Sequence, residues 1–297
     1  MKIYNTRRAL IASIACVGTL LASASINAQS DKITKFILPV ALGTPVVIDN
    51  QPGAGGIVGT AAMVKAASDG STLSVVSNNH VIFPSVYKSL PFDPINDITP
   101  IAVMGTTPLV LVVNPKVAAK DSKELVALLK AKPGSLNYAS SGNGTILDLA
   151  AEMFLVEAVI KANHIPYKGV GPMVTDLLGG QVDFGVLALP SIQAHLKSGA
   201  LRAMGTSSKA RLTAAPDIAT FAEQGLPNDI VEGWFAVIGP KNLPALEVKR
   251  IHAAFTTAFA SADVKESMGK QGNSITISTP EVATAFFKSD VDKYVTS

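Results

Sequence analysis

Short apolar runs rich in β-branched residues alternate with amphipathic stretches of helical period along this 297-residue chain. Several runs are apolar at every position, which is typical of strands covered on both faces. Regular alternation of strand and helix is typical of an α/β architecture with parallel sheets. We therefore predict an α/β fold with strands at Ile33–Leu38, Val46–Asp49, Thr72–Ser77, Ile98–Met104, Leu109–Asn114, Asn137–Ala139, Val182–Val186, Leu201–Thr206 and Phe235–Gly239.

One connection in this pattern is too short for a crossover between parallel strands. Only Val40 to Thr44 lie between the first two predicted strands and their flanking prolines. A crossover between parallel strands takes about 10–12 residues. Two alternatives remain: the two segments form a tight hairpin, or one of them is absent from the sheet.

Two predicted helices have clear starts. Asp121 with Glu124, and Thr145 with Asp148, have the spacing of a capping box, in which a side chain satisfies free N–H groups of the first turn. The second pair opens a helix that we expect to run through Val159.

The N-terminus has the three parts of a secretory signal. Lys2, Arg7 and Arg8 precede the apolar run Ala9–Leu21, and small residues follow it. We expect cleavage near Ala28, with Ala24 as the alternative, and therefore a periplasmic protein. The run has 13 residues, whereas a membrane span needs about 20.

Composition and charge exclude several classes of protein. The chain is 48% hydrophobic and 16% charged, which is unlike a disordered protein. Without the three basic residues of the signal, the remaining 22 basic residues equal the 22 acidic ones. A neutral chain has no electrostatic footprint for nucleic acid, so we expect no nucleic-acid partner.

Residues for catalysis or metal binding are not grouped in this sequence. The single cysteine, Cys16, lies in the signal, so no disulfide or thiol nucleophile is expected after cleavage. The histidines have no metal-ligand spacing, and no Gly-x-Ser-x-Gly nucleophile motif occurs. We therefore predict no catalytic residues, no metal, no cofactor and no enzymatic activity.

Polar loops at helix starts indicate an anion site instead. Ser141, Gly142, Asn143, Gly144 and Thr145 join a predicted strand to the Thr145 helix. Free N–H groups at a helix start attract anions, although an ordinary polar cap has the same composition. Gly53–Gly56 precedes a helix predicted at Ile57–Ala67, and fits either a tight turn or a second anion site.

Two further loops join this candidate site. Ser77, Asn78 and Asn79 follow a strand at its carboxyl end, where ligands bind in open α/β sheets. The third loop contains Tyr167, Lys168, Gly169 and Gly171, whose lysine either contacts a carboxylate or is simply solvated.

At these loops the sequence resembles the extracytoplasmic receptors of tripartite tricarboxylate transporters, the Bug family. The resemblance rests on an ordered series of segments: Asn50–Gly56, Asp69–Leu73, Leu90–Pro94, Leu136–Thr145, Pro166–Gly169, Asp176–Asp183 and Lys197–Ala203. It departs from the family pattern at the short connection, because members carry a glycine-rich loop and a long helix there. The first strand-to-helix crossover is therefore missing.

The resemblance implies a periplasmic-binding-protein-like, Venus flytrap fold with two lobes, each with a central mainly parallel sheet, joined by a two-strand hinge. It predicts a signal peptide over residues 1–28, a discontinuous lobe 1 over residues 29–104 and 233–297, and lobe 2 over residues 105–232. We expect the hinge near Met104–Thr107 and Val231–Gly233.

The resemblance also implies a function in transport. The receptor captures a small organic carboxylate in the interlobe cleft and delivers it, as a monomer, to transporter membrane subunits. Two alternatives stay open: the receptor signals to a sensor protein, or it is a degenerate paralogue that no longer binds.

Overall fold

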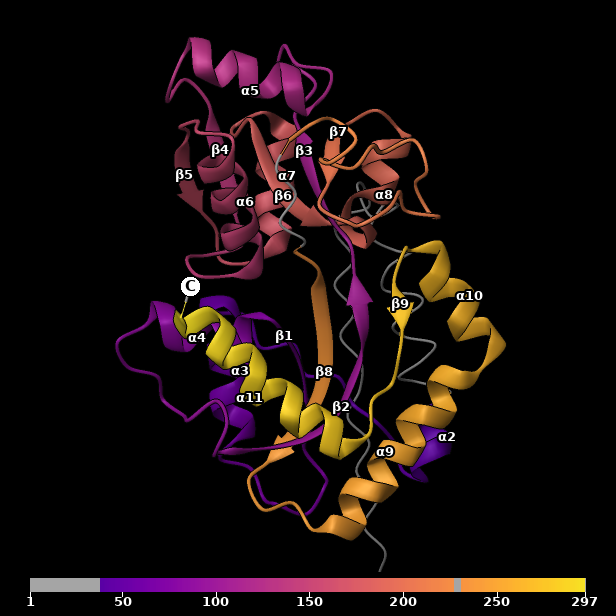
Figure 1. Cartoon of the computed structure of the whole chain (residues 1–297). Coiled ribbons are helices and arrows are strands. Elements are labelled where there is room, and N and C mark those ends of the chain that lie inside the picture. Colours follow the sequence, from indigo (N-terminus) through magenta and orange to yellow (C-terminus); the bar gives the residue numbers. More distant parts are fainter. Residues whose placement is uncertain (1–37, 227–230, 297) are drawn as a thin grey trace, which may run out of the picture.

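The computed structural model describes residues 38–226 and 231–296. Its elements form two lobes that lie end to end, each built around one sheet (Figure 1). The predicted signal peptide and nearly all of the strand predicted at Ile33–Leu38 lie outside the described residues.

Lobe 1 holds a four-stranded sheet of order β1-β8-β2-β9. Its strands are β1 (Ser74–Ser77), β2 (Ile98–Thr107), β8 (Gly233–Pro240) and β9 (Ser274–Ile275). Around them lie α2 (Leu38–Leu42), η2 (Ala54–Gly56), α3 (Ile57–Met63), α4 (Asn79–Val86), α9 (Ala245–Ala260), α10 (Ala262–Lys270) and α11 (Pro280–Thr296).

Lobe 2 holds a five-stranded sheet of order β5-β4-β6-β3-β7. Its strands are β3 (Leu109–Val113), β4 (Asn137–Ser140), β5 (Asn163–Pro166), β6 (Phe184–Ala188) and β7 (Arg202–Thr206). Its helices are α5 (Ser122–Ala131), α6 (Ile146–Glu157), α7 (Val170–Gly179) and α8 (Leu189–Lys197).

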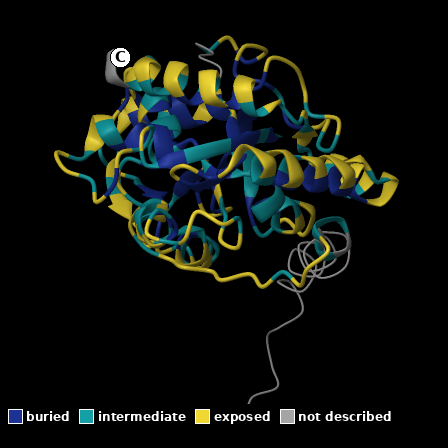
Figure 2. Cartoon of the chain, turned by 90° about the horizontal axis from the view of Figure 1, so that it is seen from below, coloured by how far each residue is buried: buried dark blue, intermediate teal, exposed yellow. Residues whose placement is uncertain are grey.

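Alternation along β8 gives lobe 1 a core on each face of its sheet. Val237 packs with Phe255 and Ile251 of α9, whereas Ala236 and Ile238 pack on the other side with Phe287 of α11. Successive side chains of a strand point to opposite faces, so one strand serves both cores. Figure 2 shows the buried residues in the interior and the exposed ones on the outer helix faces.

The expectation of mainly parallel sheets is wrong for lobe 1. β8 pairs antiparallel with β1 and with β2, and β2 pairs antiparallel with β9. Lobe 2 is mixed, because β4 is parallel to β5 and β6 whereas β3 is antiparallel to β6 and β7. The reason is connectivity: β2 and β8 run in opposite directions between the lobes, which makes their pairing antiparallel.

The short connection follows the second of its two alternatives. Leu38–Leu42 forms a one-turn helix, and Val46–Asp49 is in none of the described strands. Val47 is 88% exposed, so this apolar segment is not buried in the sheet as predicted. With only five residues between the prolines, the chain cannot cross over a sheet face and return in parallel.

The predicted hinge lies where two strands run side by side. β2 ends at Thr107, whose register partner is Gly233 at the start of β8, and Pro108 leads directly into β3. Lobe 2 is thus connected through this pair of crossings. No helix in residues 38–226 or 231–296 combines the length and apolar character needed to cross a membrane.

Candidate functional site

The cradle, residues Ser141–Thr145, links β4 to α6 as predicted. Thr145 caps α6, because its Oγ1 accepts from the N–H of Asp148 at 3.4 Å. The Thr145 hydroxyl also donates to the carbonyl of Gly142 at 2.8 Å. Ser141 Oγ in turn donates to Thr145 Oγ1 at 3.1 Å. Both hydroxyls therefore serve to shape the loop.

Several backbone N–H groups of the cradle region also have protein acceptors. Gly142 donates to Ser140 Oγ at 3.3 Å, and Gly144 donates to Asp148 Oδ2 at 2.9 Å. Within the described part of the chain, the N–H groups of Asn143 and Leu147 have no acceptor. These two groups, at the positive end of the α6 dipole, remain for an anion.

The loop Tyr167–Gly171 lies directly beside the cradle. The N–H of Tyr167 donates to the carbonyl of Ser140 at 3.0 Å, and that of Gly169 to the carbonyl of Ser141 at 3.1 Å. Lys168 and Gly171 are exposed. The structure therefore brings together the two lobe 2 loops that the sequence assigned to one site.

Tyr167 is less available than expected. Its hydroxyl donates to Asp176 Oδ2 at 2.8 Å. Burial and this carboxylate raise the pKa of Tyr167 to about 12, so it stays a neutral phenol at physiological pH. Asp176 thereby has a structural partner.

The three residues Ser77, Asn78 and Asn79 have different surroundings. Asn78 is 2% exposed, accepts from the N–H of Trp234 at 2.8 Å and donates to the carbonyl of Glu232 at 3.2 Å. Its side-chain amide therefore links the start of α4 to the segment that leads into β8. Ser77 lines a cavity of lobe 1, described below.

Asn79 bridges the lobes. Its Nδ2 donates to the carbonyl of Gly55 at 2.9 Å, and its Oδ1 accepts from the N–H of Ile146, the first residue of α6, at 2.8 Å. Nearby, Tyr87 Oη donates to the carbonyl of Asn143 at 3.1 Å. The cradle thus contacts lobe 1 along α4 and η2.

A large cavity lies within lobe 1. It measures about 1450 Å³ and lies between β1, α3, α9 and the extended segment of residues 44–51. Ser77 and Asn79 line it, but none of its lining residues belongs to 141–145 or 167–171. The cavity borders the segment that was predicted as a strand and is not in the sheet.

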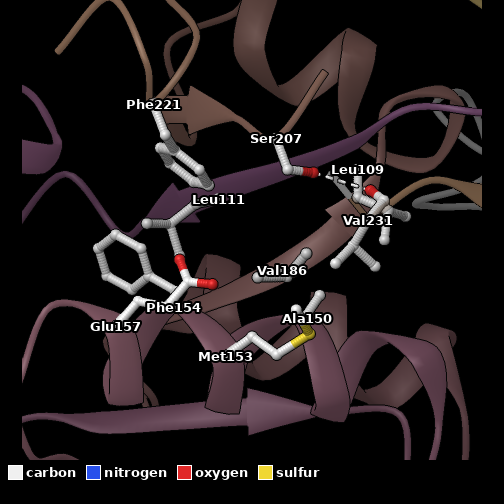
Figure 3. Close-up of a pocket in the computed structure, with 10 residues that line it drawn as sticks. All are labelled: Leu109, Leu111, Ala150, Met153, Phe154, Glu157, Val186, Ser207, Phe221 and Val231. Carbon is white, nitrogen blue, oxygen red and sulfur yellow. Dashed lines mark hydrogen bonds between the residues drawn. The ribbon is translucent and has the colours of Figure 1, made fainter. Parts of the chain in front are cut away.

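A second cavity lies in lobe 2, between β3, β6, α6 and residues near the hinge (Figure 3). It measures about 20 Å³, and Ser207 Oγ on its wall donates to the carbonyl of Val231 at 2.8 Å. A space this small holds at most about one water molecule. It is therefore not a ligand site.

A polar cluster beneath the cradle was missed in the sequence. His164 Nε2 lies 2.7 Å from Ser140 Oγ and 3.1 Å from Asp148 Oδ1. Burial raises the pKa of Asp148, although the N–H of Gly144 and the nearby His164 oppose that rise. The cluster was missed because β5 was not predicted as a strand. This short polar strand ends in Pro166 and brings His164 beside β4.

The cluster does not have the geometry of a catalytic triad. Serine and aspartate contact the same ring nitrogen, whereas a triad uses the two opposite nitrogens. The described residues contain no cluster of side chains that could hold a metal ion. Trp234 is 6% exposed in the core of lobe 1, whereas Phe235 is partly buried against the other core cluster and lines the large cavity.

Comparison with known proteins places these features in one family. The family model described as tripartite tricarboxylate transporter family receptor matches residues 37–294. Protein BugT of Bordetella pertussis is 36% identical over 256 residues, which is 86% of this chain and 78% of that protein.

Solved structures agree with this assignment. A periplasmic transporter has a TM-score of 0.85 and 34% identity, with 91% of each chain covered. MatC from Rhodopseudomonas palustris, solved with bound malate, has a TM-score of 0.84 and 25% identity, covering 91% of this chain and 93% of that one. The predicted two-lobed, periplasmic-binding-protein-like fold is thereby confirmed.

Proposed function

Because the chain belongs to the tripartite tricarboxylate transporter receptor family, we propose that it captures a small organic carboxylate in the periplasm. The family and the fold are those of solute-binding receptors, not of enzymes. The observation that carries the proposal is the hydrogen bonding of the Tyr167–Gly171 loop to the cradle at the start of α6.

The guest carboxylate lies at the free N–H groups of Asn143 and Leu147. Gly142, Gly144, Gly169 and Gly171 let the backbone approach it, and Lys168 supplies a positive charge at the rim. A helix N-terminus favours a carboxylate without a buried counter-charge. The malate bound to MatC supports a dicarboxylate as the guest.

Further parts of this proposal concern the protein's maturation and partners. The chain is cleaved near Ala28, and acts as a monomer with a hinge near Met104–Thr107 and Val231–Gly233. It then presents the loaded cleft to the membrane subunits of a tripartite permease.

A thermal-shift screen tests the proposal. Malate, other di- and tricarboxylates, acidic amino acids and aromatic carboxylates are added to the purified protein, with the diamide of malic acid as a neutral control. A ligand at 100 times its Kd stabilises the native state by about 2.7 kcal/mol, which raises Tm by several degrees. If every acid behaves like the diamide, the proposal fails.

A non-binding paralogue is the second candidate, and the cavity of about 1450 Å³ favours it. This cavity opens to solvent beside the short connection, where the chain lacks the loop and the long helix of the family pattern. A cooperative melt without any acid-induced shift supports this candidate. A cooperative melt with a shift rules it out.

A further inference from the structure

His164 connects the residues on either side of the cradle, Ser140 and Asp148, through a single ring nitrogen. Its Nε2 lies 2.7 Å from Ser140 Oγ and 3.1 Å from Asp148 Oδ1. Ser140 is fully buried, and the side chains of His164 and Asp148 are 24% and 14% exposed. The ring therefore joins the end of β4 to the first turn of α6.

Each of these partners holds one glycine of the cradle. Ser140 Oγ accepts from the N–H of Gly142 at 3.3 Å, and Asp148 Oδ2 accepts from the N–H of Gly144 at 2.9 Å. Both glycines have positive φ, of 134° and 69°. These hydrogen bonds help to fix the direction of the amide groups on either side of Asn143.

The imidazole ring is itself held in place. It stacks on Tyr138 with 4.7 Å between centroids and 9° between planes. Tyr138 is 1% exposed, and its hydroxyl donates to Glu152. The titratable groups in contact with the ring or beside it are thus Tyr138, Asp148 and Glu152.

The charge of Asp148 opposes a guest anion. Its Oδ1 is buried and has no partner of hydrogen-bonding geometry in the described part of the chain, so the 3.1 Å approach of His164 Nε2 is an ion-pair contact and not a hydrogen bond. A carboxylate there faces the same helix start that would bind the guest, and like charges repel. A protonated imidazole 3.1 Å away offsets that charge.

We propose that His164 is a positioning residue that aligns Gly142 and Gly144 through Ser140 and Asp148, and that its protonation strengthens carboxylate binding. The first half concerns this chain's own geometry. The second half rests on the proposed function.

Nuclear magnetic resonance of protein labelled with ¹⁵N-glycine tests the first half without a ligand. Imidazole changes charge between about pH 5 and 8. In the wild type, the amide signals of Gly142 and Gly144 should move together as the pH is changed across this range. His164→Gln, which keeps an amide donor but carries no charge, should abolish that movement, and His195→Gln on α8 should leave it unchanged.

Two further variants test the link through Ser140 and the link through Asp148 separately. They also keep the test available if His164→Gln does not fold. Ser140→Ala should alter the titration of Gly142 more than that of Gly144, and Asp148→Asn should do the reverse. The positioning role is overturned if both glycines titrate in His164→Gln as in the wild type, or if they do not titrate in the wild type.

Calorimetry with malate tests the second half. The Kd of the wild type should be at least threefold lower at pH 6 than at pH 8, and His164→Gln should show no such change. Equal pH dependence in both proteins overturns this half. Absence of malate binding at either pH also overturns it for malate, while the glycine signals still decide the positioning role.

Discussion

Asn79 of lobe 1 accepts a hydrogen bond from the N–H of Ile146 in lobe 2, at 2.8 Å. The same side chain donates to the carbonyl of Gly55 at 2.9 Å, so both ends of its amide are used. Asn79 therefore holds the lobes together at the N-terminus of α6, next to the N–H groups that we assign to the ligand.

Replacing Asn79 by alanine should loosen this interlobe contact. Without the amide, the N–H of Ile146 loses its acceptor and the lobes separate more readily. The radius of gyration of the ligand-free protein, measured by small-angle X-ray scattering, should increase. Asn50→Ala, at an exposed asparagine, is the matched control; equal radii for the wild type and both variants would contradict the bridge.

Gly144→Ala should destabilise the protein by about 1–3 kcal/mol. Gly144 has φ of 69°, and a Cβ there would lie 2.6 Å from Val86 Cγ1 across the interlobe contact. The left-handed conformation alone costs about 1–2 kcal/mol for a non-glycine residue.

Urea denaturation of Gly199→Ala beside Gly144→Ala separates the cost of the left-handed backbone from the cost of the contact with Val86. Gly199 has φ of 73°, but no atom lies within 4 Å of the Cβ that alanine would add, so it reports the backbone cost alone. A larger loss for Gly144→Ala measures the contact with Val86. Equal losses would mean that the lobes are not packed at this point.

Asp148 should make stability depend on pH. Burial raises its pKa in the folded protein, so the folded state retains a proton that the unfolded state has already lost. The contribution of Asp148 to stability is therefore present below the unfolded pKa of about 3.9 and is lost as pH rises through the folded value.

Asp148→Asn removes that pH dependence. Its free energy of unfolding relative to the wild type should be greater at pH 7 than at pH 4, as measured by urea denaturation at both pH values. Asp217→Asn, at an exposed aspartate, should show no such trend. If the free energy of unfolding of Asp148→Asn minus that of the wild type is instead smaller at pH 7 than at pH 4, burial does not raise the pKa of Asp148.

The edge strand β1 should promote association of the protein on heating. Among the described strands β1 pairs only with β8, and Val75 on it is 65% exposed. A charged residue on an open sheet edge opposes pairing between molecules. Val75→Lys should reduce light scattering during a thermal ramp, and Val282→Lys on α11 is the exposed control. Equal scattering from Val75→Lys and the wild type would show that β1 is not the associating edge.

Local signals in the sequence predicted much of lobe 2. Asp121 and Thr145 cap α5 and α6 as expected, because a cap depends on neighbours three residues apart. The predicted parallel direction of the strands was wrong in lobe 1, because pairing of β8 with β1 and β2 joins segments more than 100 residues apart. The contacts of His164 were missed because its partners Ser140 and Asp148 meet it only after β5, a strand that was not predicted, pairs with β4.

A crystal structure of the protein grown with malate tests the central claim most directly. We predict a carboxylate oxygen within hydrogen-bonding distance of the N–H groups of Asn143 and Leu147, with the Tyr167–Gly171 loop beside it. Malate bound elsewhere, for example in the lobe 1 cavity, with these two groups facing only water, would contradict the account.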